Sequence, residues 1–114
     1  MTTLIDCPLW TDICGYAELI PERGAGALVG GDQVAVFRLW DGSLRAVGNY
    51  DPYGAAFVIS RGIVGSRGER PIVVSPLLKH AFDLDTGAAL EDPDVRLPTY
   101  PVRLRDGRVE VGGR

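Results

Sequence analysis

The feature that most limits the fold is a series of short β-rich runs joined by glycine turns. The run 33–39 is followed by Asp41-Gly42, and the run 100–104 is followed by Asp106-Gly107. Before them we expect a loop at residues 24–26 and a hairpin turn at residues 30–32. Asp-Gly is a strong hairpin signal, because glycine readily takes the positive φ that tight turns need. No segment shows the periodicity of an amphipathic helix of ordinary length. The pattern therefore predicts an all-β sandwich or barrel.

Length and charge narrow the class of protein further. A chain of 114 residues fits a single domain, 1–114, and 46% hydrophobic residues are enough for a core. The apolar runs are too short for a membrane span. A net charge of −3 with dispersed arginines argues against a nucleic-acid partner. The N-terminus lacks the basic and apolar regions of a signal peptide, so we expect a cytoplasmic protein.

The two cysteines, Cys7 and Cys14, give no metal motif. No further Cys or His lies near them at ligand spacing. Without a secretory signal we expect reduced thiols, although six intervening residues leave a disulfide geometrically possible.

The stretch 73–87, VVSPLLKHAFDLDTG, predicts a strand, a loop and a second strand. Pro76 has no N–H and should end the pairing of the first strand. Asp85-Thr86-Gly87 is a turn sequence that should end the second. The residues between the two strands should therefore project as a tip.

Catalytic groups are sparse in the sequence. His80 is the single histidine, and Ser75 and Asp83 are nearby by residue number. This closeness in sequence is no evidence of triad geometry, and nothing places either cysteine next to His80. Asp83 and Asp85 would share one side of a strand. Carboxylates in such a position ordinarily face solvent or cap a turn. From the residues alone, this is a small β-protein without visible catalytic apparatus.

Two loops resemble those of Rieske ferredoxins. The run 75–87 resembles the second cluster-binding loop, Cys-Pro-x-His-Gly-x-x-Phe-Asp-x-x-x-Gly. The run 49–55, NYDPYGA, resembles the first, Cys-x-His-x-Gly-Ala, and 100–111 is similar to the C-terminal hairpin of that fold. The resemblance implies a Rieske-like antiparallel sandwich or barrel with a small subdomain of two loops over about 48–87.

The ligands of a Rieske cluster are absent from these loops. Such a centre needs two cysteines on one iron and two histidines on the other. The corresponding positions hold Asp51, Tyr53, Ser75 and Leu78, and His80 lies two residues past its ligand position. The resemblance thus implies a chain with no cluster, no other cofactor and no metal.

One family combines this fold with missing ligands. The chain resembles the small subunit of cytoplasmic, assimilatory NAD(P)H-dependent nitrite reductase, on the segments 7–9, 35–38, 49–53, 60–64 and 75–79. Family members tend to have Lys-Lys-Gln where this chain has Leu78-Lys79-His80. The resemblance implies a large-subunit partner with FAD, a [4Fe-4S] cluster and sirohaem, which reduces nitrite to ammonium with six electrons. A free-standing interaction module, or a ferredoxin-like component of another oxidoreductase, stays open as an alternative.

The small subunit would then act by binding its partner. The candidate interface residues lie in the two loops and just after the first: Asp51, Pro52, Tyr53, Arg61, Leu77, Leu78, Lys79 and His80. Asp51 could instead cap its own turn while Tyr53 packs over the second loop.

Other residues have preferred roles within the domain. We expect Arg61 to bind a carboxylate inside the domain rather than across an interface. We expect Leu77 to point outward and Leu78 inward, with Lys79 and His80 at a polar rim. Trp10 and Trp40 are expected to pack in the core or at strand edges.

Overall fold

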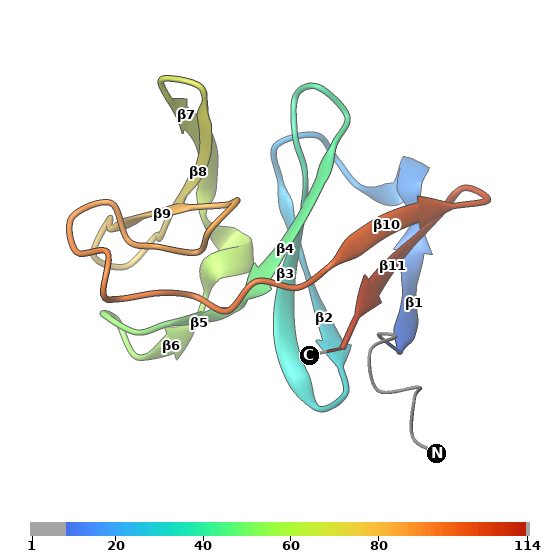
Figure 1. The fold of residues 1–114 in the computed structure, drawn as a ribbon, viewed down its shortest axis with the longest axis horizontal. Coiled ribbons are helices and arrows are strands. Elements are labelled where there is room, and N and C mark those ends of the chain that lie inside the picture. Colours follow the sequence, from blue (N-terminus) through green and yellow to red (C-terminus); the bar gives the residue numbers. More distant parts are fainter. Residues whose placement is uncertain (1–8, 114) are drawn as a thin grey trace, which may run out of the picture.

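The computed structural model describes residues 9–113, so Cys7 lies outside the described residues. Within this range the chain forms antiparallel strands and two short 3-10 helices (Figure 1). No helix among these residues is long and apolar enough to cross a membrane. The elements are β1 (Trp10–Gly15), η2 (Tyr16–Glu18), β2 (Gly24–Val29), β3 (Asp32–Arg38), β4 (Leu44–Gly48), β5 (Tyr50–Asp51), β6 (Ala56–Phe57), η3 (Ile59–Arg61), β7 (Ile63–Arg67), β8 (Arg70–Val74), β9 (Ala81–Asp83), β10 (Val102–Arg105) and β11 (Arg108–Gly112).

The described residues form three three-stranded sheets. Their strand orders are β2-β3-β4, β7-β8-β9 and β1-β11-β10, and β5 pairs with β6 in a small ribbon. The glycine turns fall where the sequence predicts them, with positive φ at Gly31, Gly42 and Gly107. The all-β architecture that the turn pattern predicted is confirmed.

One predicted loop is part of a strand. Residues 24–26, which resemble a glycine loop, begin β2 and pair with β3 from Gly24↔Phe37 onward. A side chain at Gly24 would lie 2.3 Å from the carbonyl oxygen of Ser60. The glycine therefore permits close packing of β2 on η3, and this tertiary contact overrides the weak strand propensity.

Strand β3 is buried on both faces and separates two apolar clusters. Val34 and Val36 belong to a cluster with the C-terminal hairpin, whereas Ala35 and Phe37 belong to a cluster with the β7-β8-β9 sheet. This alternation follows from the two-residue period of a strand. The cluster of Ala35 and Phe37 also contains Phe82, whose ring contacts that of Tyr53 in the first loop.

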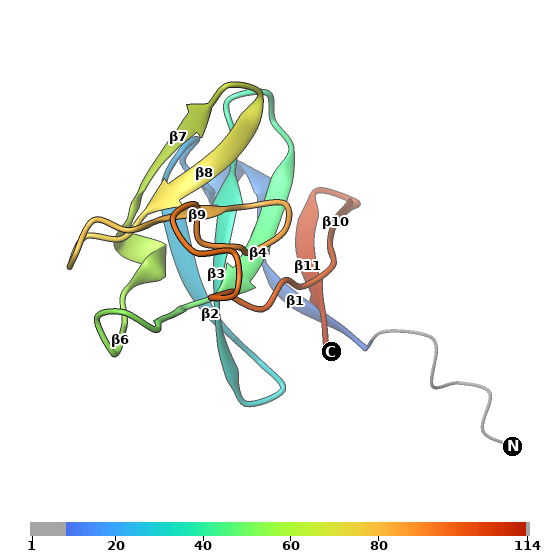
Figure 2. The same ribbon diagram turned by 60° about the vertical axis from the view of Figure 1, so that its left-hand side comes forward.

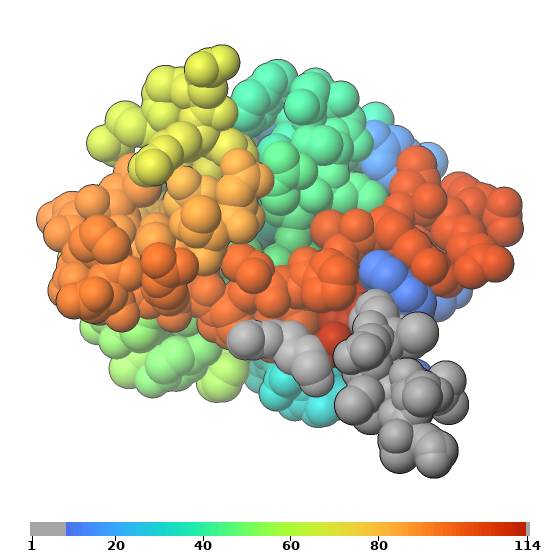
Figure 3. All heavy atoms as spheres, viewed as in Figure 1, coloured from blue at the N-terminus to red at the C-terminus, as the bar shows by residue number. Residues whose placement is uncertain are grey.

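The segment 84–101 connects β9 to β10 across the face shown in Figure 3. It pairs with the central sheet through the bridge Val47↔Thr99 and the hydrogen bond from the Tyr100 N–H to the Ala46 carbonyl, at 2.9 Å. The connection thus links the loop-bearing part of the chain to the C-terminal hairpin.

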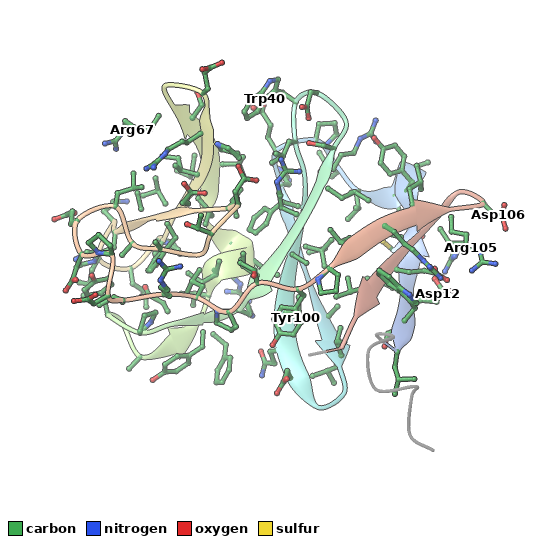
Figure 4. All side chains as sticks on the ribbon, in the orientation of Figure 1. Asp12, Trp40, Arg67, Tyr100, Arg105 and Asp106 are labelled. Carbon is green, nitrogen blue, oxygen red and sulfur yellow. The ribbon has the colours of Figure 1, made fainter. Side chains whose placement is uncertain are left out.

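The two tryptophans differ in environment. Trp10 packs against Arg103, whose guanidinium lies 4.0 Å from the ring centroid, as expected for a strand-edge residue. Trp40 is exposed at a hairpin tip (Figure 4), so the packing role predicted for it is wrong. Tyr16 reaches this turn and donates its hydroxyl to the Gly42 carbonyl at 2.6 Å, but the Trp40 side chain stays largely uncovered.

Candidate functional site

The two loops meet on one side of the molecule, where Figure 2 shows the chain around β6 and the chain between β8 and β9 projecting together. Asp51 and Ser75 lie at their base with 0% of each residue exposed. The Ser75 hydroxyl donates a hydrogen bond to Asp51 Oδ2. Asp51 Oδ1 accepts the N–H groups of Tyr53 at 2.8 Å and Gly54 at 3.1 Å. The carboxylate therefore caps its own turn, as predicted, and also ties one loop to the other.

Backbone hydrogen bonds close each loop. In the first loop the Ala55 N–H donates to the Asp51 carbonyl at 2.7 Å. In the second, the Ser75 N–H donates to the His80 carbonyl at 2.9 Å, and Lys79 has a positive φ of 62°. Strand pairing in β8 stops before Pro76, as the missing N–H requires.

Two aromatic rings stack between the loops. The Tyr53 and His80 ring centroids lie 3.6 Å apart with an angle of 7° between the planes. Tyr53 also contacts the buried Phe82 at 6.0 Å between centroids. Burial raises the pKa of the Tyr53 phenol, and the carboxylates of Asp92 and Glu91 raise it further. The expectation that Tyr53 packs over the second loop is confirmed, and its partner there is His80.

The two leucines of the second loop are arranged differently from the prediction. Leu78 is 57% exposed and Leu77 is 45% exposed, so the inward orientation predicted for Leu78 is wrong. It is Leu77 that faces the first loop: a methyl group added at Gly54 would lie 2.6 Å from Leu77 Cδ1. The left-handed conformation of Lys79 turns the chain back only after both leucines, which leaves Leu78 at the tip.

These contacts decide whether the loops fit a Rieske cluster, which takes thiolate and imidazole ligands. Asp51 and Ser75 are hydrogen-bonded to each other, Tyr53 lies against His80, and Leu78 has no ligand atom. Among residues 9–113 no group of three or more His, Cys, Asp or Glu side chains is arranged to hold a metal ion. The residues present do not fit the cluster.

No catalytic triad forms from the residues that the sequence offers. Ser75 binds Asp51, His80 stacks on Tyr53, and Asp83 accepts the N–H of Asp85 at 2.7 Å. Asp83 therefore acts as a turn cap, one of the two ordinary roles expected for it. Asp85 forms an ion pair with Arg45 at 2.6 Å, which the sequence did not indicate.

The remaining candidates lie on the surface. Pro52 and Lys79 are exposed beside the leucines. Arg61 is exposed at the end of η3 and forms no ion pair with another described residue, so the internal carboxylate partner predicted for it is not found there. It lines a groove together with Arg23. Sequence reasoning missed Arg23, because the contact between 21–24 and 60–64 arises only from packing of β2 on η3.

Comparison with known proteins places this geometry in a family. The family model described as Rieske-like [2Fe-2S] domain matches residues 9–112. The nitrite reductase (NADH) small subunit of Escherichia coli K12 is 37% identical over 105 residues, covering 91% of this chain and 97% of that protein. A solved structure from Mycobacterium tuberculosis, assigned as an NADH-dependent nitrite reductase small subunit, superposes with a TM-score of 0.92 at 54% identity, covering 96% of this chain and 98% of the other.

A further relative is much longer than this chain. The nitrite reductase [NAD(P)H] large subunit of Klebsiella oxytoca is 35% identical over 105 residues, which cover 92% of this chain but 11% of that protein. The family model and the solved structure confirm the Rieske-like fold that the resemblance implied. The chain belongs to the Rieske-like [2Fe-2S] domain family and, within it, to the nitrite reductase small subunits.

Proposed function

We propose that this chain is the small, cofactor-free subunit of a cytoplasmic NAD(P)H-dependent nitrite reductase of nitrate assimilation. It acts as a single domain, 1–114, without catalytic residues of its own. Its large subunit carries FAD, a [4Fe-4S] cluster and sirohaem, and reduces nitrite to ammonium with six electrons. The Klebsiella oxytoca relative, in which a similar segment is part of a large subunit, supports a working association between the two.

The observation that carries the proposal is the buried bond between Asp51 and Ser75. It joins two of the positions that would hold cluster ligands, and the Tyr53–His80 stack engages a third. Buried polar groups that satisfy each other are stable as they stand and need no metal ion to compensate their burial. The two loops therefore keep their conformation without a cluster, and this supports a role in binding a partner protein.

The proposed docking surface is the tip formed by the two loops. Its exposed side chains are Pro52, Leu77, Leu78 and Lys79, with the edges of Tyr53 and His80 between them. Leucines exposed beside one another at a loop tip form an apolar patch, and such patches mark contact surfaces for partner proteins. Asp51 is too deeply buried to touch a partner and acts by holding the tip together.

Co-expression with the sirohaem-containing large subunit tests the proposal. We expect a complex that survives purification, nitrite-dependent oxidation of NAD(P)H that falls when the small subunit is omitted, and a small subunit that is colourless and free of iron after anaerobic purification. Failure to co-purify, together with unchanged activity, would favour an interaction module serving another oxidoreductase. Iron and visible absorbance in the isolated chain would favour a ferredoxin.

A further inference from the structure

Strand β7 has a free edge. Among residues 9–113 it is the outer strand of the β7-β8-β9 sheet and pairs only with β8, around the turn between Arg67 and Arg70. In a hairpin with a two-residue turn, the two residues that flank the turn form a hydrogen-bonded pair. Along the strands, hydrogen-bonded and non-hydrogen-bonded residue pairs then alternate. Val64 and Ser66 therefore direct their N–H and C=O groups away from β8. Pro71, opposite Ser66, agrees with this assignment because it has no N–H to donate.

The side chains along this edge leave room for another backbone. Ile63 is 68% exposed. Gly65, two residues on and on the same face, has no neighbouring atom within 4 Å of the position that a Cβ would take. A glycine inside a strand often marks a place where another backbone approaches closely. Between Ile63 and Ser66 the edge also lacks the lysine, proline or bulge with which proteins usually block edge pairing.

A positively charged groove adjoins the start of β7. It has a volume of about 610 Å³ and lies between residues 21–24 and 60–64. Arg23 and Arg61 line it, against the single carboxylate of Glu22 among the lining residues. Neither arginine forms an ion pair within the part of the chain that the structure describes. The Arg23 N–H donates to the Ile20 carbonyl at 3.0 Å, which fixes the turn that presents this side chain. Two unpaired guanidinium groups in a chain of net charge −3 favour an acidic ligand.

We propose that β7 accepts an extended, acidic segment of the large subunit as an additional strand. The segment's backbone pairs with Val64 and Ser66, an apolar side chain covers Ile63, and its carboxylates lie between Arg23 and Arg61. Strand addition of this kind takes its affinity from main-chain hydrogen bonds and its specificity from the flanking side chains. The proposal rests on the proposed function for its partner, but it concerns a surface distinct from the loop tip.

A proline substitution tests the strand pairing. Ser66→Pro removes an N–H that β8 does not use, so the domain should keep its fold. The matched control is Leu104→Pro on β10, because Leu104 holds the same position relative to its own two-residue turn. The two hairpins lie at opposite ends of the molecule, as Arg67 and Arg105 show in Figure 4. Against the purified large subunit we expect Ser66→Pro to weaken Kd about tenfold or more, and Leu104→Pro to change it less than about twofold.

Two further measurements keep the proposal testable if Ser66→Pro does not fold. In the wild-type complex, hydrogen exchange at the Ser66 amide should slow at least about tenfold while the Leu104 amide is unchanged. The double variant Arg23→Glu/Arg61→Glu should bind at least about tenfold more weakly and with a smaller dependence on salt. An unprotected Ser66 amide, or full affinity in Ser66→Pro, overturns the strand pairing, and full affinity in the arginine variant overturns the acidic segment. Absence of binding by the wild-type chain would instead overturn the proposed function.

Discussion

The bond between Asp51 and Ser75 should contribute measurably to stability. Ser75→Ala removes one hydroxyl and almost no volume, so its main effect is to take one donor from a fully buried carboxylate. Asp51 keeps the N–H groups of Tyr53 and Gly54, so the main loss is one charge-assisted hydrogen bond. The Ser75 hydroxyl also accepts the Leu77 N–H, but that bond is long, at 3.4 Å, and should contribute little. Such bonds contribute about 1.5–3 kcal/mol, so we expect the free energy of unfolding to fall by about 2 kcal/mol. For a domain of this size the melting temperature should fall by roughly 8 °C.

Urea unfolding at neutral pH, followed by circular dichroism, measures this change. The control is Ser43→Ala, which removes the same kind of bond, from the Ser43 hydroxyl to Asp41 at 2.6 Å, on an exposed turn. Water replaces the lost donor there, so stability should change little. Asp51→Asn should cost less than Ser75→Ala, since an amide keeps an oxygen for the two N–H groups and offers a donor to Ser75. If Ser75→Ala lost no more stability than Ser43→Ala, the reasoning about the buried carboxylate would be refuted.

Three other predictions concern single features. Tyr53→Ala should move the His80 ring protons downfield in NMR spectra, towards unstacked values, and unchanged shifts would contradict the stack. The pKa of Tyr53 is raised in the folded chain, so the phenol of the unfolded chain ionises first and the free energy of unfolding should fall as pH rises above about 10. Urea titrations should show a smaller fall for Tyr53→Phe, and equal falls would show that the raised pKa has no effect on stability. Gly87→Ala should lower the free energy of unfolding by more than about 3 kcal/mol, because φ is 81° and a Cβ would lie 2.0 Å from the Leu97 carbonyl oxygen. Gly107→Ala, with a φ of 78° and open space, should cost only about 1–2 kcal/mol, and equal losses in thermal or urea unfolding would contradict the steric argument.

Local signals predicted the hairpins well. The turns at Asp41-Gly42 and Asp106-Gly107 appear in the structure because their φ values depend on residues adjacent in sequence. The start of β2 was missed for the opposite reason. Residues 24–26 are a strand only because β3 and η3 pack against them, and no neighbouring residue in sequence reports that contact.

The site shows the same division between local and distant information. The turn cap by Asp51 is local and was predicted from its residue type. Its bond to Ser75 spans 24 residues of sequence, and the exposure of Leu78 depends on a left-handed lysine that no glycine or asparagine signals. The resemblance predicted that the two loops lie together, but the bond between Asp51 and Ser75 is seen only in the three-dimensional structure.

The burial of β3 on both faces bears on how the protein unfolds. Ala35 and Phe37 belong to the apolar cluster beneath the loops, and Val34 and Val36 belong to the one beneath the C-terminal hairpin. Loss of β3 would disrupt both clusters at once, so neither the loop-bearing sheet nor the C-terminal hairpin would keep a complete apolar core. The loops should therefore unfold in a single cooperative transition with the C-terminal hairpin, with the slowest amide exchange along β3. The loop surface would then share the stability of the entire domain, so a substitution in the distant hairpin would alter how often the loops open.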